Sequence, residues 1–177
     1  IKFILVARML YEKGVLEYVE AAKKIKKTYP STEFFLLGPA ATNNPSSITQ
    51  TTIDFWVRSG YVNYLGTTSN IKKYLTYADC VVLPSYYSEG VPRSLLEAGA
   101  MGKMVITTDN VGCRDAVDDG INGFICAPRS VDDLTEKLTR VIKMTHEERI
   151  LMGLMGREKM EKEFDEVIVL DKYLKYI

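Results

Sequence analysis

The sequence predicts an α/β fold, a doubly wound, Rossmann-like parallel sheet of about six strands with helices on both faces and further helices at the C-terminal end. Three observations predict it. Short apolar segments alternate along the chain with longer segments of helical periodicity. The apolar segments are continuously hydrophobic, which is typical of strands that are buried on both faces. The 177 residues, 46% hydrophobic and 26% charged, suit a single domain with a sizeable core.

Each predicted strand is a short apolar segment that is followed by a glycine, a proline or a polar loop. Strands of this length, separated by helical segments, are expected to pair in parallel. The predicted strands cover residues 3–7, 33–37, 62–65, 80–83, 104–106 and 124–126.

The predicted helices lie between and after these strands. Pro30 closes the first helix, and Pro92 stands in the first turn of the fourth. Ser130 begins a later helix, and Thr145 with Glu148 forms a capping box for another. The helices cover residues 15–29, 51–59, 70–77, 92–101 and 114–117, followed by helices that begin at residues 130 and 145 and continue to residue 177.

Composition excludes several classes of protein. Lysine plus arginine equals aspartate plus glutamate, at 23 each, which argues against a broad nucleic-acid-binding surface. No apolar segment approaches the roughly 18 residues that a membrane span requires.

The chain begins with Ile1 and enters a strand almost at once. We therefore expect these residues to be one part of a longer protein.

Other motifs are missing. Three cysteines without a CxxC pair predict neither a disulfide framework nor a zinc site, and a reducing cytoplasm is their simplest setting. His146 is the single histidine, so neither a zinc centre nor a serine-hydrolase triad is supported. Neither GxGxxG nor GxxxxGK[ST] follows a predicted strand. The sequence therefore predicts no metal and no dinucleotide cofactor.

In open α/β sheets, ligands bind beyond the carboxyl ends of the strands. This rule selects the loops in which chemistry is expected. They cover residues 8–14, 38–44, 66–70, 85–93 and 107–115.

The loop over residues 85–93 leads from a strand into the start of a helix. A helix N-terminus presents free N–H groups and a partial positive charge, which suits a phosphate. Pro92 has no N–H, so the amides of Gly90, Val91 and Arg93 are the candidate donors. Ordinary turn chemistry explains the same glycine and proline equally well.

Two carboxylates flank this helix start. Glu89 precedes it and Glu97 lies one turn inside it, and a carboxylate is a natural acceptor for sugar or ribose hydroxyls. The alternatives are an exposed i,i+4 pair of Glu97 with Arg93, and compensation of the helix dipole by Glu89, worth about 0.3–1 kcal/mol.

Two cations, Arg8 and Lys13, follow the first strand, and Gly14 then turns the chain into a helix. Together they could neutralise a diphosphate without a metal. Considered alone, they are also typical of solvated loop charges.

Taken together, these segments resemble the C-terminal domain of the GT4 (group 1) glycosyltransferases, which have the GT-B fold. The resemblance rests on Arg8, Lys13 and Gly14 in the first loop, on residues 89–102, which resemble EGxPxxxLEAxAxG, and on residues 119–124, which resemble DGxNGF. It extends over nearly the whole chain. It implies that residues 1–177 form a single nucleotide-sugar-binding domain, and that an N-terminal acceptor domain belongs to the same enzyme.

The resemblance also implies roles for individual residues. Arg8 and Lys13 would bind the donor diphosphate, Glu97 the ribose and Glu89 the transferred sugar. Arg8, Lys13 and Glu89 would therefore act in catalysis. The loops that begin at Gly38 and Gly66 would flank the base. The remaining donor-binding positions surround the helix start: Gly90, Val91, Pro92 and Arg93.

The implied activity is the transfer of a sugar, with retention of anomeric configuration and without a metal, from a nucleoside-diphosphate donor. Details near residues 84–94 and 112–114 resemble a subgroup that builds surface polysaccharides on lipid carriers, often from UDP-linked N-acetylated sugars. The acceptor would be a glycan or a polyprenyl-linked glycan. The enzyme would be cytoplasmic, at the inner face of the membrane, with peripheral membrane contact only through the N-terminal domain.

Two other functions compete with this one. A non-catalytic nucleotide-sugar-binding or regulatory module would use the same motifs. A receiver-type signalling domain would require acidic residues after the first strand, where this chain has Arg8. Asp115 also departs from the family, in which glutamate is common at that position, so its role stays open.

Overall fold

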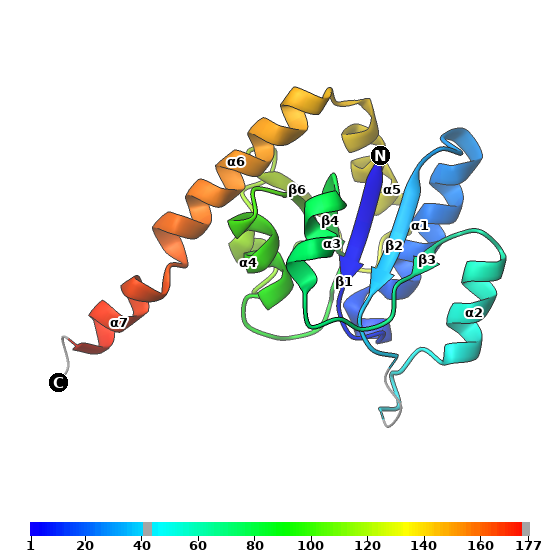
Figure 1. Ribbon diagram of the computed structural model, residues 1–177, viewed down its shortest axis with the longest axis horizontal. Coiled ribbons are helices and arrows are strands. Elements are labelled where there is room, and N and C mark those ends of the chain that lie inside the picture. Colours follow the sequence, from blue (N-terminus) through cyan, green and yellow to red (C-terminus); the bar gives the residue numbers. More distant parts are fainter. Residues whose placement is uncertain (41–43, 175–177) are drawn as a thin grey trace.

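The computed structural model describes residues 1–40 and 44–174, and it confirms the predicted doubly wound α/β fold (Figure 1). All pairings in the six-stranded sheet are parallel, in the order β3-β2-β1-β4-β5-β6. The strand order reverses between β1 and β4, where ligands bind in folds of this kind. The strands are β1 (Lys2–Val6), β2 (Glu33–Leu37), β3 (Asn63–Tyr64), β4 (Cys80–Leu83), β5 (Met104–Thr108) and β6 (Gly123–Cys126).

The helices follow the strands as the periodicity predicts. Two short 3₁₀ helices, η1 (Tyr11–Lys13) and η2 (Arg114–Ala116), stand in the loops after β1 and β5. The α-helices are α1 (Val15–Thr28), α2 (Gln50–Arg58), α3 (Ile71–Tyr77), α4 (Arg93–Ala100), α5 (Val131–Lys143), α6 (His146–Glu163) and α7 (Glu166–Leu174). No helix in this described part of the chain is long and apolar enough to cross a membrane.

Two hydrophobic clusters cover the two faces of the sheet. Successive side chains of a strand point to opposite faces, so Phe3 and Leu5 of β1 belong to the cluster with α1, α2 and α5, whereas Ile4 and Val6 belong to the cluster with α3 and α4. Figure 1 shows these helices on the sheet. Burial on both faces explains why these strands are continuously apolar.

The predicted helix caps are confirmed. The Ser130 hydroxyl accepts a hydrogen bond from the Asp133 amide at the start of α5. Thr145 and Glu148 form the reciprocal capping box at the start of α6. Each cap satisfies N–H groups that the first turn of a helix leaves without partners.

One predicted helix boundary was wrong. Pro92 lies outside α4 as its N-cap, because its ψ of 127° is extended, and α4 begins at Arg93. The C-terminal segment is helical, as predicted, and forms two helices, α6 and α7. It breaks after Glu163, because the Asp165 carboxylate accepts a hydrogen bond from the Val167 amide and starts α7 anew. Of the predicted elements, residues 41–43 in the loop after β2 and residues 175–177 lie outside the described residues.

Helix α6 packs directly on the turn between α4 and β5. A Cβ atom at Gly153 would collide with the carbonyl oxygen of Gly102, whereas one at Gly156 would meet its nearest neighbour, Asn122 Cβ, at 3.7 Å. Glycine at position 153 therefore permits a backbone contact, and glycine at position 156 leaves room for a methyl group.

We expect Gly153→Ala to lower the free energy of unfolding by about 1–3 kcal/mol, because the added methyl group overpacks this contact. Gly156→Ala on the same helix is the matched control, and its higher helix propensity should leave stability unchanged or raised by up to about 1 kcal/mol. Urea denaturation of both variants measures the difference. Equal midpoints for the two variants would contradict the packing argument.

Candidate functional site

The loops that follow β1, β4 and β5 meet at the carboxyl edge of the sheet. Gly14 lies against the carbonyl group of Pro84, and Gly112 lies against the carbonyl groups of Glu89 and Gly90. Both glycines have positive φ, at 72° and 80°, and a Cβ atom at either position would collide with that backbone. These two contacts bring the three loops together into one surface.

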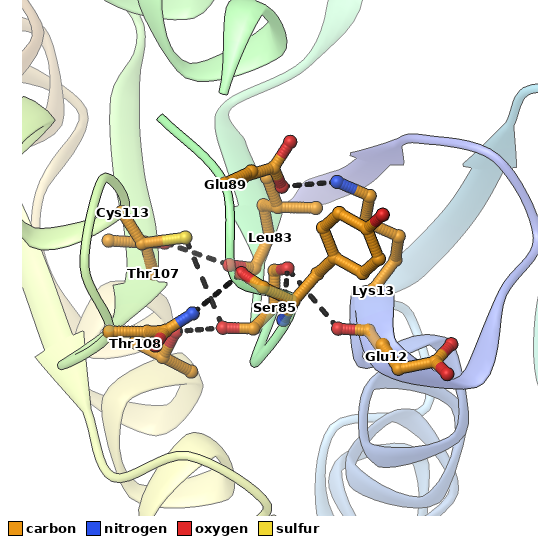
Figure 2. Close-up of polar contacts among 10 residues, drawn as sticks. Glu12, Lys13, Leu83, Ser85, Glu89, Thr107, Thr108 and Cys113 are labelled. Atoms are coloured by element: carbon orange, nitrogen blue, oxygen red, sulfur yellow. Dashed lines mark hydrogen bonds and ion pairs between the residues drawn. The ribbon is translucent and has the colours of Figure 1, made fainter. Parts of the chain in front are cut away.

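Ser85 connects the same three loops by hydrogen bonds (Figure 2). Its side chain is fully buried, and its hydroxyl donates to the carbonyl oxygen of Glu12 at 3.2 Å. The Thr108 hydroxyl donates to the carbonyl oxygen of Ser85, and the Thr107 hydroxyl donates to that of Leu83 at 2.8 Å. The loop after β4 is thus anchored from both neighbouring strands.

Tyr87 is anchored by the same network. Its amide donates to the Ser85 hydroxyl at 3.2 Å, and its carbonyl oxygen accepts from the side-chain amide of Asn110 at 2.8 Å. Its ring centroid lies 4.8 Å from the Lys13 ammonium. Sequence reasoning assigned no role to Ser85, Tyr87, Thr108 or Asn110, because their contacts join positions that are far apart in the chain.

Lys13 is buried, with 7% of its surface exposed, and its ammonium forms an ion pair with the Glu89 carboxylate (Figure 2). Its position contradicts the alternative of a solvated loop charge. Glu89 is the counter-ion of Lys13, which the interpretation as helix-dipole compensation did not foresee. Arg8 is exposed, and it takes part in no ion pair among the described residues, so the structure does not join it to this pair.

The start of α4 lies next to Glu89 in the chain. The amides of Gly90, Val91 and Arg93 donate to no protein acceptor within residues 1–40 and 44–174. Pro92 is buried, whereas Gly90 and Arg93 are exposed. Free N–H groups at an exposed helix start can donate hydrogen bonds to a bound anion.

Glu97 forms the i,i+4 pair that was the alternative interpretation, with Arg93 Nε 2.8 Å from Glu97 Oε1. Both residues also line a cavity of about 520 Å³ between α3 and α4, and that position is compatible with ligand binding. The other polar residues of its wall belong to the start of α3 or to α4: Ser69, Asn70, Lys72 and Ser94.

The loops after β2 and β3 lie side by side. The Gly38 amide donates to the carbonyl oxygen of Gly66 at 2.8 Å. A smaller cavity of about 210 Å³, lined in part by Gly38 and Thr67, shares Val6 and Ile71 with the wall of the larger cavity. The predicted base-flanking loops are therefore adjacent to the cavity that Glu97 lines.

All three cysteines are buried, and the Cys113 thiol lies beside the site, 3.9 Å from the carbonyl oxygen of Ser85 (Figure 2). Burial raises the pKa of the Cys126 thiol to about 12, and it also raises the pKa values of the Cys80 and Cys113 thiols. A protonated thiol is a poor nucleophile and a poor metal ligand. No group of three or more potential metal-ligating side chains occurs among the residues that the structure describes.

Comparison with known protein families gives one clear match. Residues 1–159 match the family described as glycosyl transferases group 1. The chain is 34% identical over 173 residues to the N,N'-diacetylbacillosaminyl-diphospho-undecaprenol alpha-1,3-N-acetylgalactosaminyltransferase of Campylobacter jejuni, covering 97% of this chain and 43% of that protein. It is 32% identical over 142 residues to a glycogen synthase of Mycobacterium tuberculosis, covering 80% of this chain and 34% of that protein.

Solved structures share the fold. Anabaena Alr3699/HepE in complex with UDP and glucose superposes with a TM-score of 0.85 at 20% identity, over 99% of this chain and 47% of that one. The C-terminal domain of the group 1 protein LpcC from Francisella tularensis superposes with a TM-score of 0.79 at 22% identity, over 92% of this chain and 85% of that one. The chain thus spans less than half the length of the first relatives it matches.

Gly112 and Gly90 allow a test of how the loops are joined. We expect Gly112→Ala to lower the free energy of unfolding by about 2–4 kcal/mol, because its methyl group collides with residues 89–90 and its positive φ becomes strained. A Cβ atom at Gly90 would meet nothing within 4 Å, so Gly90→Ala should change stability by less than about 0.5 kcal/mol. Chemical denaturation compares the two, and a similar loss in both would contradict the packing at Gly112.

Proposed function

Because the chain belongs to the group 1 glycosyl transferases, we propose that it is the donor-binding domain of a retaining enzyme that transfers a sugar from a nucleoside diphosphate. We further propose that the donor is a UDP-linked, N-acetylated sugar and that the acceptor is a glycan or a lipid-linked glycan. The activity named for the Campylobacter relative and the UDP in the HepE complex support these choices.

One observation carries the proposal. The buried Lys13 ammonium, the free amides before α4 and the Glu97 carboxylate all come from loops or helix starts at the carboxyl edge of one sheet. A nucleotide sugar needs those three kinds of group, since it presents a diphosphate, ribose hydroxyls and sugar hydroxyls.

The proposed mechanism is electrostatic. As the sugar leaves, negative charge accumulates on the diphosphate, and fixed cations and N–H groups directed at it stabilise the transition state. Arg8, Lys13 and the amides of Gly90, Val91 and Arg93 supply them. Each charge-assisted hydrogen bond contributes about 1.5–3 kcal/mol, or roughly 10- to 150-fold in rate if it is fully expressed in the transition state.

The other residues recognise the donor. Glu97 accepts hydrogen bonds from the ribose hydroxyls in the cavity between α3 and α4, and Arg93 holds its carboxylate in place. Glu89 accepts hydrogen bonds from the transferred sugar. The loops at Gly38 and Gly66 flank the base, beside the same cavity. Neither Glu89 nor Glu97 is assigned as a general base.

The acceptor is expected to bind outside these residues. The relatives are more than twice as long as this chain, and we propose that an N-terminal domain brings the acceptor to the donor from the cytoplasmic side. Residues 1–177 by themselves should therefore bind the donor weakly and turn nothing over.

Calorimetry tests the donor site. We expect UDP to bind the wild-type chain with much higher affinity than GDP. We expect Arg8→Ala and Glu97→Ala each to lower the affinity for UDP at least about tenfold, because each removes one charge-assisted contact. Glu161→Ala is the matched control, because Arg157 and Glu161 form the same i,i+4 pair on α6, also with Nε and Oε1 2.8 Å apart. Equal affinity in the wild type and in both site variants would refute the assignment.

Metal independence has its own test. We expect UDP to raise the temperature of unfolding to the same extent in EDTA and in millimolar Mg²⁺, because protein cations and amides neutralise the diphosphate. A shift that appears only with Mg²⁺ would show that a metal is required.

A further inference from the structure

The Lys13 ammonium already has protein partners. The Glu89 carboxylate pairs with it, and the Tyr87 ring lies 4.8 Å away. Lys13 is also the cation expected to meet the donor diphosphate. A diphosphate that binds Lys13 must therefore either share it with Glu89 or displace Glu89.

Displacement is the favourable outcome. Lys13 is 7% exposed, and a buried charge is costly without a counter-ion, so one of the two anions must stay beside it. Two anions crowded on one ammonium repel each other. The diphosphate carries more negative charge than a carboxylate, and the Glu89 side chain, 25% exposed, has access to solvent.

Taking the proposed donor site as given, we propose that the donor exchanges the counter-ion of Lys13. The diphosphate takes the ammonium, and the released Glu89 carboxylate accepts hydroxyl groups of the transferred sugar. Binding of the diphosphate and recognition of the sugar are then coupled through one side chain. A nucleoside diphosphate without a sugar breaks the Lys13–Glu89 pair and gains nothing at Glu89 in return.

Tyr87 is the positioning residue for this exchange. Its backbone is held by the Ser85 hydroxyl and the Asn110 side chain, and neither contact involves Glu89. A cation over an aromatic face is stabilised without any competing negative charge. The ring therefore keeps the ammonium at the carboxyl edge of the sheet while its anionic partner changes.

The test is a double-mutant cycle on Lys13 and Glu89, with UDP and UDP-N-acetylgalactosamine as calorimetric probes. We expect Glu89→Gln to bind UDP about tenfold more tightly than the wild type. UDP then no longer has to break the Lys13–Glu89 pair, and tenfold is the factor for one charge-assisted contact. The same variant should lose the advantage of the nucleotide sugar over UDP. In the Lys13→Gln background, Glu89→Gln should no longer tighten UDP binding, because the competition for the ammonium is gone.

Glu12→Gln is the charge-matched control. It removes one negative charge next to Lys13 in sequence, from a carboxylate that accepts a hydrogen bond from Ser46. It should not reproduce the tightening. Tyr87→Phe should bind UDP as the wild type does, because the ring remains, whereas Tyr87→Leu should weaken it.

Several results would overturn the exchange. Unchanged or weaker UDP binding by Glu89→Gln would contradict it. An equal gain in UDP affinity from Glu89→Gln in the Lys13→Gln background would also contradict it, because that gain would indicate general charge repulsion. Equal affinities in Tyr87→Phe and Tyr87→Leu would remove the positioning role. In each of these cases wild-type UDP binding leaves the proposed function standing, whereas a wild-type chain that binds no UDP refutes the function and the exchange together.

Discussion

The backbone around Ser85 is the point on which the site depends. A buried hydroxyl and a buried carbonyl group must both find partners, and here the partners come from the loop after β1 and from the end of β5. The loop after β4 is thus held from two sides. The close approach of Gly112 to residues 89–90 adds a third restraint on the same loop. The segment that carries Tyr87 and Glu89 is therefore held by contacts with both neighbouring loops.

The same loops accommodate a buried charge. Placing the Lys13 ammonium out of solvent costs free energy, which its pair with Glu89 and the nearby Tyr87 ring offset only in part. Such a pair contributes little to stability compared with apolar packing, so its presence at the carboxyl edge of the sheet favours a functional interpretation. The glycines and hydroxyl groups that join the three loops stabilise them. The charged groups of the site remain available to a ligand.

Sequence reasoning was most successful where the signal is local. The apolar segments located all six strands, and the caps at Ser130 and Thr145 located two helix starts, because capping joins residues three positions apart. It failed at Pro92, where one residue decides whether the chain is helical or extended. The i,i+4 pair of Glu97 with Arg93 was recognised as an alternative for the same reason, since its partners are neighbours on one helix.

The sequence by itself determined the fold class, the family, and which loops carry acidic, basic and glycine residues, because these follow from periodicity and from motifs within short segments. Only the tertiary structure decided that Lys13 is buried against Glu89, 76 positions away, and that Ser85 joins Glu12 and Thr108. Parallel strands bring their carboxyl ends together whatever lies between them in the chain. Contacts between those ends are therefore set by strand order and loop packing, which no local pattern contains.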